Sequence, residues 1–466
     1  MEIRWLDWIA SPLLMHAASV VGVVLALVLV SRVLRSPREP AATAAWLAVI
    51  ILLPLVGVPL YLMFGDRKLR QQLTRKRPID LPDRERKLQH PVHDMLVSLG
   101  IPAASSGNQT KFHDSGEKAW EGLLELLETA SSSIDIAIFI LADDEVGRAL
   151  LARLEGKAAE GVNVRLLLDG VGSFKLPSRR LQRLRQLGGR VAWFIPVLHR
   201  PMRGKTNLRN HRKIVIVDGQ RVWSGGRNLG REYLAESCGE DCWIDLSFSQ
   251  QGPCTVVYRS IFEADWAFAA RESWPPVPAL PEDTSNELGR IQVVPSGPDV
   301  AGDPLHAALL VACYEARYRI CLVTPYFVPD RSLQEALQLA ALRGVRVDMV
   351  LPERSNHRLA DVARSRYLRE LAAAGANIWL LPSAMVHAKA LVIDKKLGLA
   401  GSANLDLRSL FLNFEVVSLF YSETEIRWLE QWMEDLIRQS RLSQPLAVGK
   451  GRELIEGIVE LLAYQL

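Results

Sequence analysis

The first 66 residues contain two long apolar stretches separated by a short charged segment. Residues 8–31 and 40–65 hold no Asp, Glu, Lys or Arg, which makes them 24 and 26 residues long. A helix needs about 20 apolar residues to cross a bilayer, so each stretch is long enough to span one. We therefore predict a membrane anchor of two transmembrane helices over residues 1–66. Pro54 and Pro59 in the second stretch leave a kinked or re-entrant segment open.

Basic residues after the second apolar stretch indicate the orientation of this anchor. The segment 67–110 is predicted to be a basic juxtamembrane linker, whereas the short connection between the stretches carries three arginines. The positive-inside bias therefore places the large C-terminal part in the cytoplasm. The basic run suits either an anionic lipid surface or a plain flank that stops translocation. It consists of Arg67, Lys68, Arg70, Arg75, Lys76 and Arg77.

From about residue 110 onward, strand-like and helix-like patterns alternate, and the alternation occurs twice. The strand-like runs are residues 134–140, 162–168 and 189–194 in the first copy and 320–323, 345–351 and 375–380 in the second. This order predicts an α/β fold with mixed, largely parallel sheets covered by helices. We place the first repeat at 111–271, a Pro-rich linker at 272–288, and the second repeat with C-terminal helices at 289–466.

Each copy then carries the motif H-x-K-x4-D. Its residues are His211, Lys213 and Asp218 in the first copy and His387, Lys389 and Asp394 in the second. Composition alone would give on the order of 0.01 such matches per chain, so two matches at equivalent places are not coincidence. We take these six residues as the catalytic motifs.

Further matches follow each motif at equal offsets. Gly226 and Asn228 lie 15 and 17 residues after the first histidine, as Ser402 and Asn404 do after the second. An acidic residue then interrupts an apolar run in each copy. These acidic residues are Asp245 and Glu415.

These residue types suit chemistry on a phosphate. Lysine supplies a point charge for a phosphoryl oxygen, and asparagine adds neutral donors. One neutral imidazole can attack phosphorus while the second protonates the leaving alkoxide and then deprotonates the incoming alcohol. Asp245 or Glu415 at the far ring nitrogen would fix the tautomer of each histidine. No metal is required, although copper or zinc binding by the two histidines is the rival interpretation.

The aspartate of each motif is expected to act differently from the His–Lys pair. Side chains alternate along a strand, so His and Lys, two positions apart, project from one face. Asp218 and Asp394 come seven positions after their histidines, where each strand ends, and parity places them on the other face. We expect an orienting or structural role near the site, unless a bulge shifts the register.

Overall composition adds two constraints. The formal net charge of +4 over 466 residues is too small to indicate a nucleic-acid partner. The five cysteines show no zinc-binding spacing. We therefore interpret them as reduced core residues.

The doubled motif, each copy followed by G-[GS]-x-N, resembles the phospholipase D superfamily. Within it, the chain is similar to bacterial cardiolipin synthases of the phospholipase D type, and the likeness covers nearly the whole chain. The runs that carry it are Pro54–Gly57 with Tyr61, Arg209–Val215, Asn404–Ser409 and Leu412–Glu415.

The resemblance implies two α/β/α halves with one active site between them, in a multi-pass protein of the bacterial inner membrane. It implies transfer of a phosphatidyl group from one phosphatidylglycerol to another, giving cardiolipin and glycerol through a phospho-histidine without a cofactor. His211 would be the nucleophile and His387 the acid and base, with the lysines and asparagines binding phosphate. Gly226 in place of a serine weakens any hydroxyl contact from the first half.

Several alternatives stay open. The donor lipid could differ, or water could be the acceptor, which would make the chain a phospholipase D. A nuclease or an inactive lipid-binding scaffold fits less well, and the oligomeric state is unknown. The expected partners are anionic phospholipids and the bilayer, not nucleic acid.

The two copies differ in length just before the first motif. The distance from Gly189 to His211 is 22 positions, but from Gly375 to His387 it is 12. The extra residues contain Arg200 and Arg203, which we predict to bind the second anionic lipid. A solvated surface loop is the alternative.

Overall fold

The computed structural model divides the chain into two compact units. One consists of Met1–Gln72 with Leu198–Asn207, and the other of Leu73–Val197 with Leu208–Leu466. The structure describes residues 27–31, 40–54, 57–58, 61, 76, 78–82, 88–196, 208–235, 242–273, 289–382, 384–443 and 448–461.

In the first unit, helix α3 (Pro40–Leu52) lies in the second apolar stretch. Ile50 is buried in a small cluster with Leu29, Val58 and Tyr61. Among the residues that the structure describes, no helix is both long and apolar enough to cross a bilayer. The predicted pair of spanning helices is therefore not confirmed, and most of residues 8–31 lies outside the described residues.

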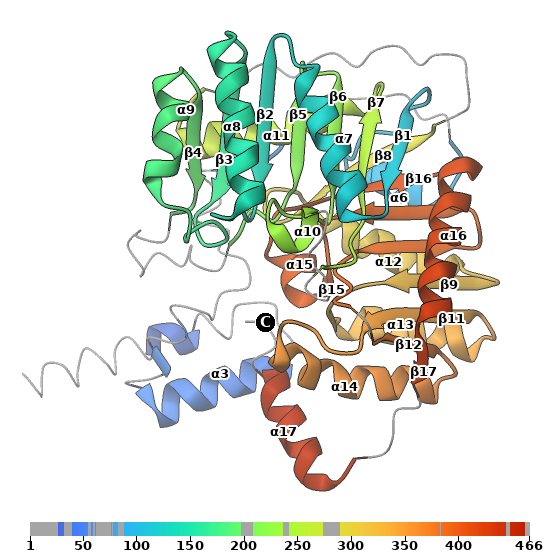
Figure 1. The fold of residues 1–466 in the computed structure, drawn as a ribbon. Coiled ribbons are helices and arrows are strands. Elements are labelled where there is room, and N and C mark those ends of the chain that lie inside the picture. Colours follow the sequence, from blue (N-terminus) through green and yellow to red (C-terminus); the bar gives the residue numbers. More distant parts are fainter. Residues whose placement is uncertain are drawn as a thin grey trace, which may run out of the picture. The chain divides into compact units, whose positions relative to one another are not determined.

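The second unit contains one sheet from each repeat (Figure 1). The first sheet has the order β1-β7-β6-β5-β2-β3-β4 and the second β17-β12-β11-β9-β13-β14-β16-β8. The strands of the first sheet are β1 (Gln109–His113), β2 (Ser133–Ile138), β3 (Asn163–Asp169), β4 (Arg190–Phe194), β5 (Ile214–Val217), β6 (Arg221–Gly225) and β7 (Ser247–Gln251). Those of the second are β8 (Ile291–Ser296), β9 (Arg319–Val323), β11 (Arg346–Pro352), β12 (Asn377–Leu381), β13 (Ala390–Ile393), β14 (Leu397–Gly401), β16 (Glu415–Phe420) and β17 (Arg441–Ser443). A separate pair joins β10 (Phe327–Val328) to β15 (Leu405–Asp406).

Parallel pairing within the two large sheets is confined to β2-β3-β4 and β9-β11-β12. The expectation of largely parallel sheets is therefore wrong, although the mixed α/β fold in two repeats is confirmed. The reason is the type of connection. Crossover helices join these three strands in each repeat, whereas tight hairpins join β5 to β6 and β13 to β14, which makes them antiparallel.

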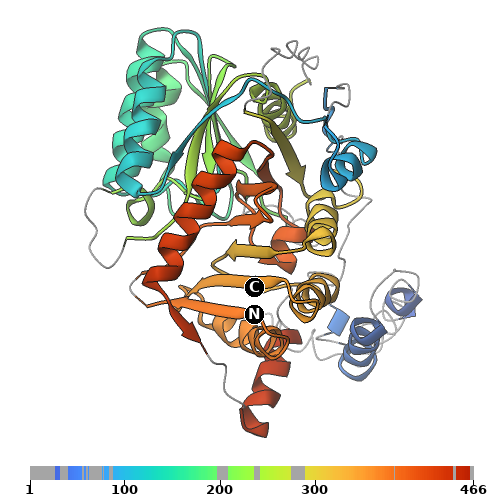
Figure 2. The ribbon, with the colours of Figure 1, turned by 90° about the vertical axis from the view of Figure 1, so that its right-hand side faces the viewer.

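Helices cover the outer face of each sheet and fill the space between the sheets. Figure 2 shows α7 and α8, in teal, on one face of the first sheet and α11 on the other. Alternate strand residues accordingly enter different cores: Ile134 and Ile136 pack with α7 and α8, whereas Ala137 packs with α11. In the second repeat, Leu322 faces α12 and α13, and Val323 faces α16. The core between the sheets therefore joins the two repeats.

The helices of the second unit have the following bounds. They are α6 (Pro91–Ser98), α7 (Gly116–Glu128), α8 (Glu145–Ala159), η1 (Ser178–Leu181), α9 (Gln182–Gln186), α10 (Arg231–Leu234), α11 (Thr255–Ala270), α12 (Pro304–Glu315), α13 (Arg331–Leu342), α14 (Arg358–Ala373), α15 (Leu407–Phe411), α16 (Glu423–Gln439) and α17 (Lys450–Leu461).

In the described part of the chain, one cysteine departs from the expectation of reduced core residues. Cys254, Cys313 and Cys321 are buried and are not disulfide-bonded, as predicted. Cys242 is disulfide-bonded instead. It lies in an irregular segment outside the packed strands and helices.

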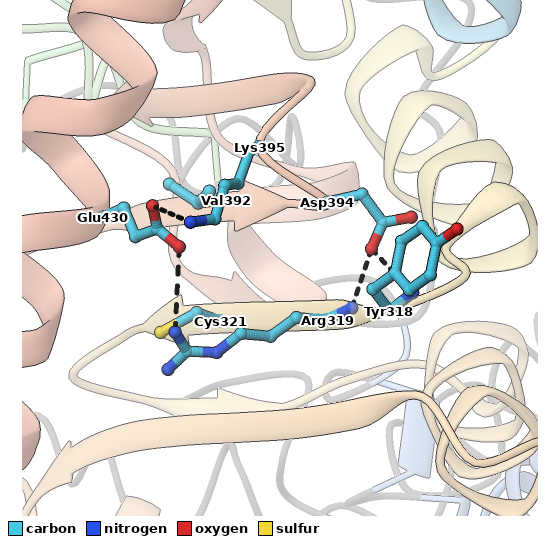
Figure 3. Close-up of a pocket in the computed structure, with 7 residues that line it drawn as sticks. All are labelled: Tyr318, Arg319, Cys321, Val392, Asp394, Lys395 and Glu430. Atoms are coloured by element: carbon cyan, nitrogen blue, oxygen red, sulfur yellow. Dashed lines mark hydrogen bonds and ion pairs between the residues drawn. The ribbon is translucent and has the colours of Figure 1, made fainter.

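The motif aspartates lie in the turns that connect β5 to β6 and β13 to β14. Asp218 and Asp394 both adopt left-handed backbone conformations, with φ of 52° and 50°. The Asp218 carboxylate accepts the backbone N–H groups of residues 131–133 at 2.8–3.2 Å. The Asp394 carboxylate accepts those of residues 317–319 at 2.6–2.8 Å, beside a small pocket bounded by Lys395 and Glu430 (Figure 3). Each aspartate thus fastens its hairpin to the start of the neighbouring strand.

This position corrects the expectation that the aspartates lie near the site. Seven residues of extended chain span roughly 20 Å, so each aspartate lies at the far end of its strand from the histidine. A structural role therefore stays the prediction for both aspartates.

Replacing either aspartate tests this assignment. We expect Asp218→Asn and Asp394→Asn each to lower the free energy of unfolding by about 1–3 kcal/mol. The reason is that a neutral amide accepts the three backbone N–H groups less strongly than the carboxylate does. Denaturant unfolding of the full chain in detergent measures this loss. The folded fraction should keep its turnover, and a hundredfold lower kcat in a fully folded variant would place the aspartate in the chemistry.

Candidate active site

The two histidines lie in segments that bridge to the opposite repeat. The His211 N–H donates to the carbonyl of Phe414 at 2.9 Å, and the His387 N–H donates to the carbonyl of Ile244 at 2.7 Å. Both bridges are parallel and immediately precede the hairpin strands β5 and β13. The same local arrangement therefore occurs twice: the first histidine segment binds the second repeat, and the second histidine segment binds the first repeat.

The acidic residues follow the same crossed arrangement. Nδ1 of His211 lies 2.9 Å and 3.0 Å from the two carboxylate oxygens of Glu415 in the second repeat. Nδ1 of His387 lies 2.6 Å from Oδ2 of Asp245 in the first repeat. An acceptor at Nδ1 keeps the proton there and leaves the Nε2 lone pair free. Each imidazole is therefore oriented for chemistry by the other half of the duplication.

The glycine–serine difference between the copies has a steric cause. Ser402 Oγ donates to Glu415 at 2.5 Å. At the equivalent Gly226, an added Cβ would lie 2.1 Å from Oδ1 of Asp245. Asp245 accepts the backbone N–H of Leu246 at 2.7 Å instead. Gly226 is therefore a requirement for seating Asp245.

Both motif lysines are buried beside their own histidines. Lys213 Nζ donates to the carbonyl of His211 at 2.8 Å. Lys389 Nζ likewise contacts the carbonyl of His387 and lies 3.2 Å from its Nε2. Burial lowers the pKa of Lys213 to about 7 and that of Lys389 to about 8. The lysines are thus placed where an anionic phosphate oxygen would restore their charge.

The histidines are neutral at pH 7. Burial lowers the pKa of His211 to about 4, against the opposing effect of Glu415. Burial and the nearby Lys389 charge lower the pKa of His387 to about 3. Burial alone would raise the pKa of Asp245, but the charges of Lys389 and His387 hold it well below its usual range. The buried carboxylate therefore stays ionised as an acceptor.

The two motifs also act on each other electrostatically. The charge of Lys389 contributes to the lowered pKa of His211, and that of Lys213 to the lowered pKa of His387. The structure thus brings both His–Lys pairs, both carboxylates and Ser402 into one buried site.

The two motif asparagines are both buried, and each has its own polar contacts. Asn228 Oδ1 accepts the N–H of Ile140 at 3.2 Å, and its side chain bonds the Tyr233 hydroxyl. Asn404 contacts Asp406, and its Oδ1 has no hydrogen-bond partner in the described part of the chain.

Three aromatic residues at the site were not predicted from the sequence. The Phe139 ring lies 5.0 Å from that of His211, and the Tyr233 and Trp243 rings lie 5.3 Å and 5.2 Å from that of His387. Phe139 lies near the end of the predicted strand 134–140, directly after the observed β2, and Trp243 precedes Asp245 by two positions. These positions are the signals that the sequence offers. Arg200 and Arg203 lie outside the described residues.

Comparison with known families agrees with this geometry. A family model described as "Cardiolipin synthase, PLD-like domain" matches residues 123–266 and 309–437, more than half of the chain. The chain belongs to this family. A second model, described as "Phospholipase_D-nuclease N-terminal", matches residues 24–65, within the predicted anchor.

Relatives extend the likeness over most of the sequence. Cardiolipin synthase 1 of Bacillus anthracis is 33% identical over 428 residues, covering 86% of this chain and 84% of the relative. The major cardiolipin synthase ClsA of Bacillus subtilis (strain 168) is 30% identical, covering 92% and 93%. The crystal structure of phosphatidylserine synthase from Haemophilus influenzae Rd KW20 has a TM-score of 0.59 at 16% identity, covering 81% of this chain and 99% of that one. This last likeness shows the shared fold.

The Gly226 contact makes a sharp prediction. We expect Gly226→Ala to lower kcat by about 100-fold, because the new methyl group displaces Asp245 from His387. Gly156→Ala is the matched control, since a Cβ at Gly156 in α8 meets open space. Steady-state assays of both purified variants measure the effect. Equal activity of the two variants would show that the Asp245 position does not matter.

The pKa values predict an unusual pH profile. Because the attacking imidazole must be neutral, kcat/KM should fall only as the pH drops towards about 4. Because the lysines must be charged to attract phosphate, it should also fall as the pH rises through about 7–8. The pH dependence of kcat/KM measures both limbs, and an acidic limb near the ordinary histidine pKa of 6.5 would contradict the burial argument.

Proposed function

We propose that this chain is a cardiolipin synthase that transfers a phosphatidyl group between two phosphatidylglycerol molecules through a phosphate ester of His211. The observation that carries the proposal is the crossed pair of His–carboxylate contacts in a member of this family. Two oriented imidazoles with two lysines supply a nucleophile, a proton carrier and phosphate-binding charge, as a double displacement requires.

In the first half-reaction, Nε2 of His211 attacks the phosphorus of one phosphatidylglycerol. The bond from phosphorus to the glycerol headgroup oxygen breaks, and His387 donates a proton to that oxygen so that glycerol leaves. The anionic phosphodiester favours the imidazolium form of His387 that this step needs. Lys213 and Lys389, with Asn228 and Asn404, stabilise the charge on the non-bridging oxygens.

In the second half-reaction, a headgroup hydroxyl of another phosphatidylglycerol attacks the same phosphorus. His387 takes the hydroxyl proton, the bond between phosphorus and Nε2 of His211 breaks, and cardiolipin forms. The aromatic rings of Phe139, Tyr233 and Trp243 limit water beside the histidines, which supports transfer to an alcohol over hydrolysis.

We further propose a membrane setting for this reaction. The apolar stretches of residues 8–31 and 40–65 would anchor the chain in a bacterial cell membrane, with the repeats on the cytoplasmic side. Arg200 and Arg203 would contact the second anionic lipid.

Product analysis tests the proposed reaction. Detergent-purified protein and labelled phosphatidylglycerol should give cardiolipin and glycerol, with undiminished yield in EDTA. His211→Ala should reduce the product below detection, because no nucleophile remains. Phosphatidic acid as the main product would make the chain a phospholipase, and loss of activity in EDTA would contradict the metal-free route.

A further inference from the structure

Four charged side chains form a buried ion cluster next to the first histidine motif: Lys76, Arg212, Asp265 and Asp299. Lys76 Nζ lies 2.6 Å from Asp265 and also pairs with Asp299. The Arg212 guanidinium lies 2.7 Å from Asp265 and 3.1 Å from Asp299. No side chain of the four is more than 1% exposed. The cluster therefore holds two positive and two negative charges out of contact with solvent.

The buried ion cluster is connected directly to the catalytic groups. Arg212 follows His211 in the chain, and its Nε donates to the carbonyl of Glu415 at 3.1 Å. On the other side of the histidine, Asn210 Nδ2 donates to Asp265 at 2.8 Å. Both neighbours of His211, and the backbone of the carboxylate that orients it, are thus held by these four charges.

Phe414 provides a further connection. Its carbonyl accepts the His211 N–H, and its ring lies 4.6 Å from Lys76 Nζ and 5.5 Å from the Arg212 guanidinium. Both cations of the cluster therefore also contact the residue that bridges the two repeats at the site.

Lys76 is the member that comes from outside the repeats. It belongs to the basic run that follows the second apolar stretch, for which the sequence left open a lipid-facing role or a plain flank. Three residues later, the Ile79 N–H donates to the carbonyl of Asp299 at 3.4 Å, so the linker is fastened to the cluster at two points. Lys76 is therefore an interior residue of the second unit.

The charge balance of the cluster means that removing the Lys76 ammonium would destabilise the folded state. Without its ammonium, Arg212 alone would face two buried carboxylates, which leaves one uncompensated negative charge in the interior. The structure can respond by moving Arg212 or the carboxylates, and either movement shifts Asn210, His211 or Glu415.

We propose that Lys76 is a positioning residue, whose ammonium completes the buried ion cluster and so makes the alignment of His211 with Glu415 depend on the seating of the linker. The activity readout of this inference rests on the proposed function. A simple structural lysine would stabilise the fold without selectively changing turnover, which separates the two roles.

The test uses the full chain in detergent and a double-mutant cycle. The variants are Lys76→Met, Asp299→Asn and the combination, which restores a neutral cluster. Lys111→Met is the matched control, because Lys111 pairs with Glu125 at the surface with 69% of its side chain exposed. Turnover is measured on phosphatidylglycerol and on bis(p-nitrophenyl) phosphate, a chromogenic phosphodiester that reports the histidine chemistry whichever lipid is the natural substrate.

We expect Lys76→Met to lower kcat about 10–100-fold with KM within twofold, since the loss lies in alignment and not in lipid binding. The double variant should have a kcat at least tenfold higher than that of Lys76→Met, and Lys111→Met should have the kcat of the wild type. Recovery in a folded double variant supports the proposal even if the single variant does not fold.

Three results would overturn the inference. They are wild-type kcat in Lys76→Met, a double variant no better than the product of the two single effects, and a change confined to KM for the lipid. A wild-type protein that cleaves the chromogenic ester without forming cardiolipin would refute the proposed lipid reaction and leave the Lys76 comparison readable.

Discussion

The hydrogen bond between each motif histidine and a carboxylate from the other repeat is the interaction on which the rest of the site depends. His211 is held by Glu415 and His387 by Asp245. Both carboxylates are fully buried, where an unpaired charge would be strongly unfavourable. The histidines, for their part, gain a fixed tautomer only from these acceptors. Neither repeat can therefore assemble a working half-site alone.

Desolvation determines how this arrangement works chemically. It keeps both imidazoles neutral, so one can act as a nucleophile at neutral pH, and it weakens the charge of both lysines. A bound phosphodiester adds a negative charge beside these lysines. Its binding favours charged lysines and a protonated His387 at the moment they are needed. Binding of the substrate's negative charge therefore also shifts the lysines and His387 to the protonation states that the reaction needs.

Much of the site could be predicted from the sequence because its chemistry is carried by local spacing. The two H-x-K-x4-D motifs, the asparagines and the interrupting acids all follow at equal offsets, and the structure brings His, Lys and acid together. The crossing of Asp245 and Glu415 could not be derived, because it depends on how the sheets pack and not on separation along the chain. Parity predicted that Asp218 and Asp394 do not face the substrate, and the structure places them in hairpin turns at the far end of each strand from the histidines.

Two other departures have similar physical causes. Helices between strands suggested parallel sheets, yet the tight turns at the motif aspartates impose antiparallel hairpins. Lys76 was indistinguishable in sequence from the other basic residues of its run, because its buried partners, Asp265 and Asp299, lie about 190 and 220 residues away. Long-range charge pairing of this kind leaves no local pattern.

The most direct test of the account is to locate the covalent phosphate in enzyme that is quenched in alkali during turnover of labelled phosphatidylglycerol. Peptide mapping should place the label on His211, and Glu415→Gln in the other repeat should reduce that label sharply. Label on His387, or full labelling of His211 in the Glu415→Gln variant, would contradict the crossed assignment on which the account is built.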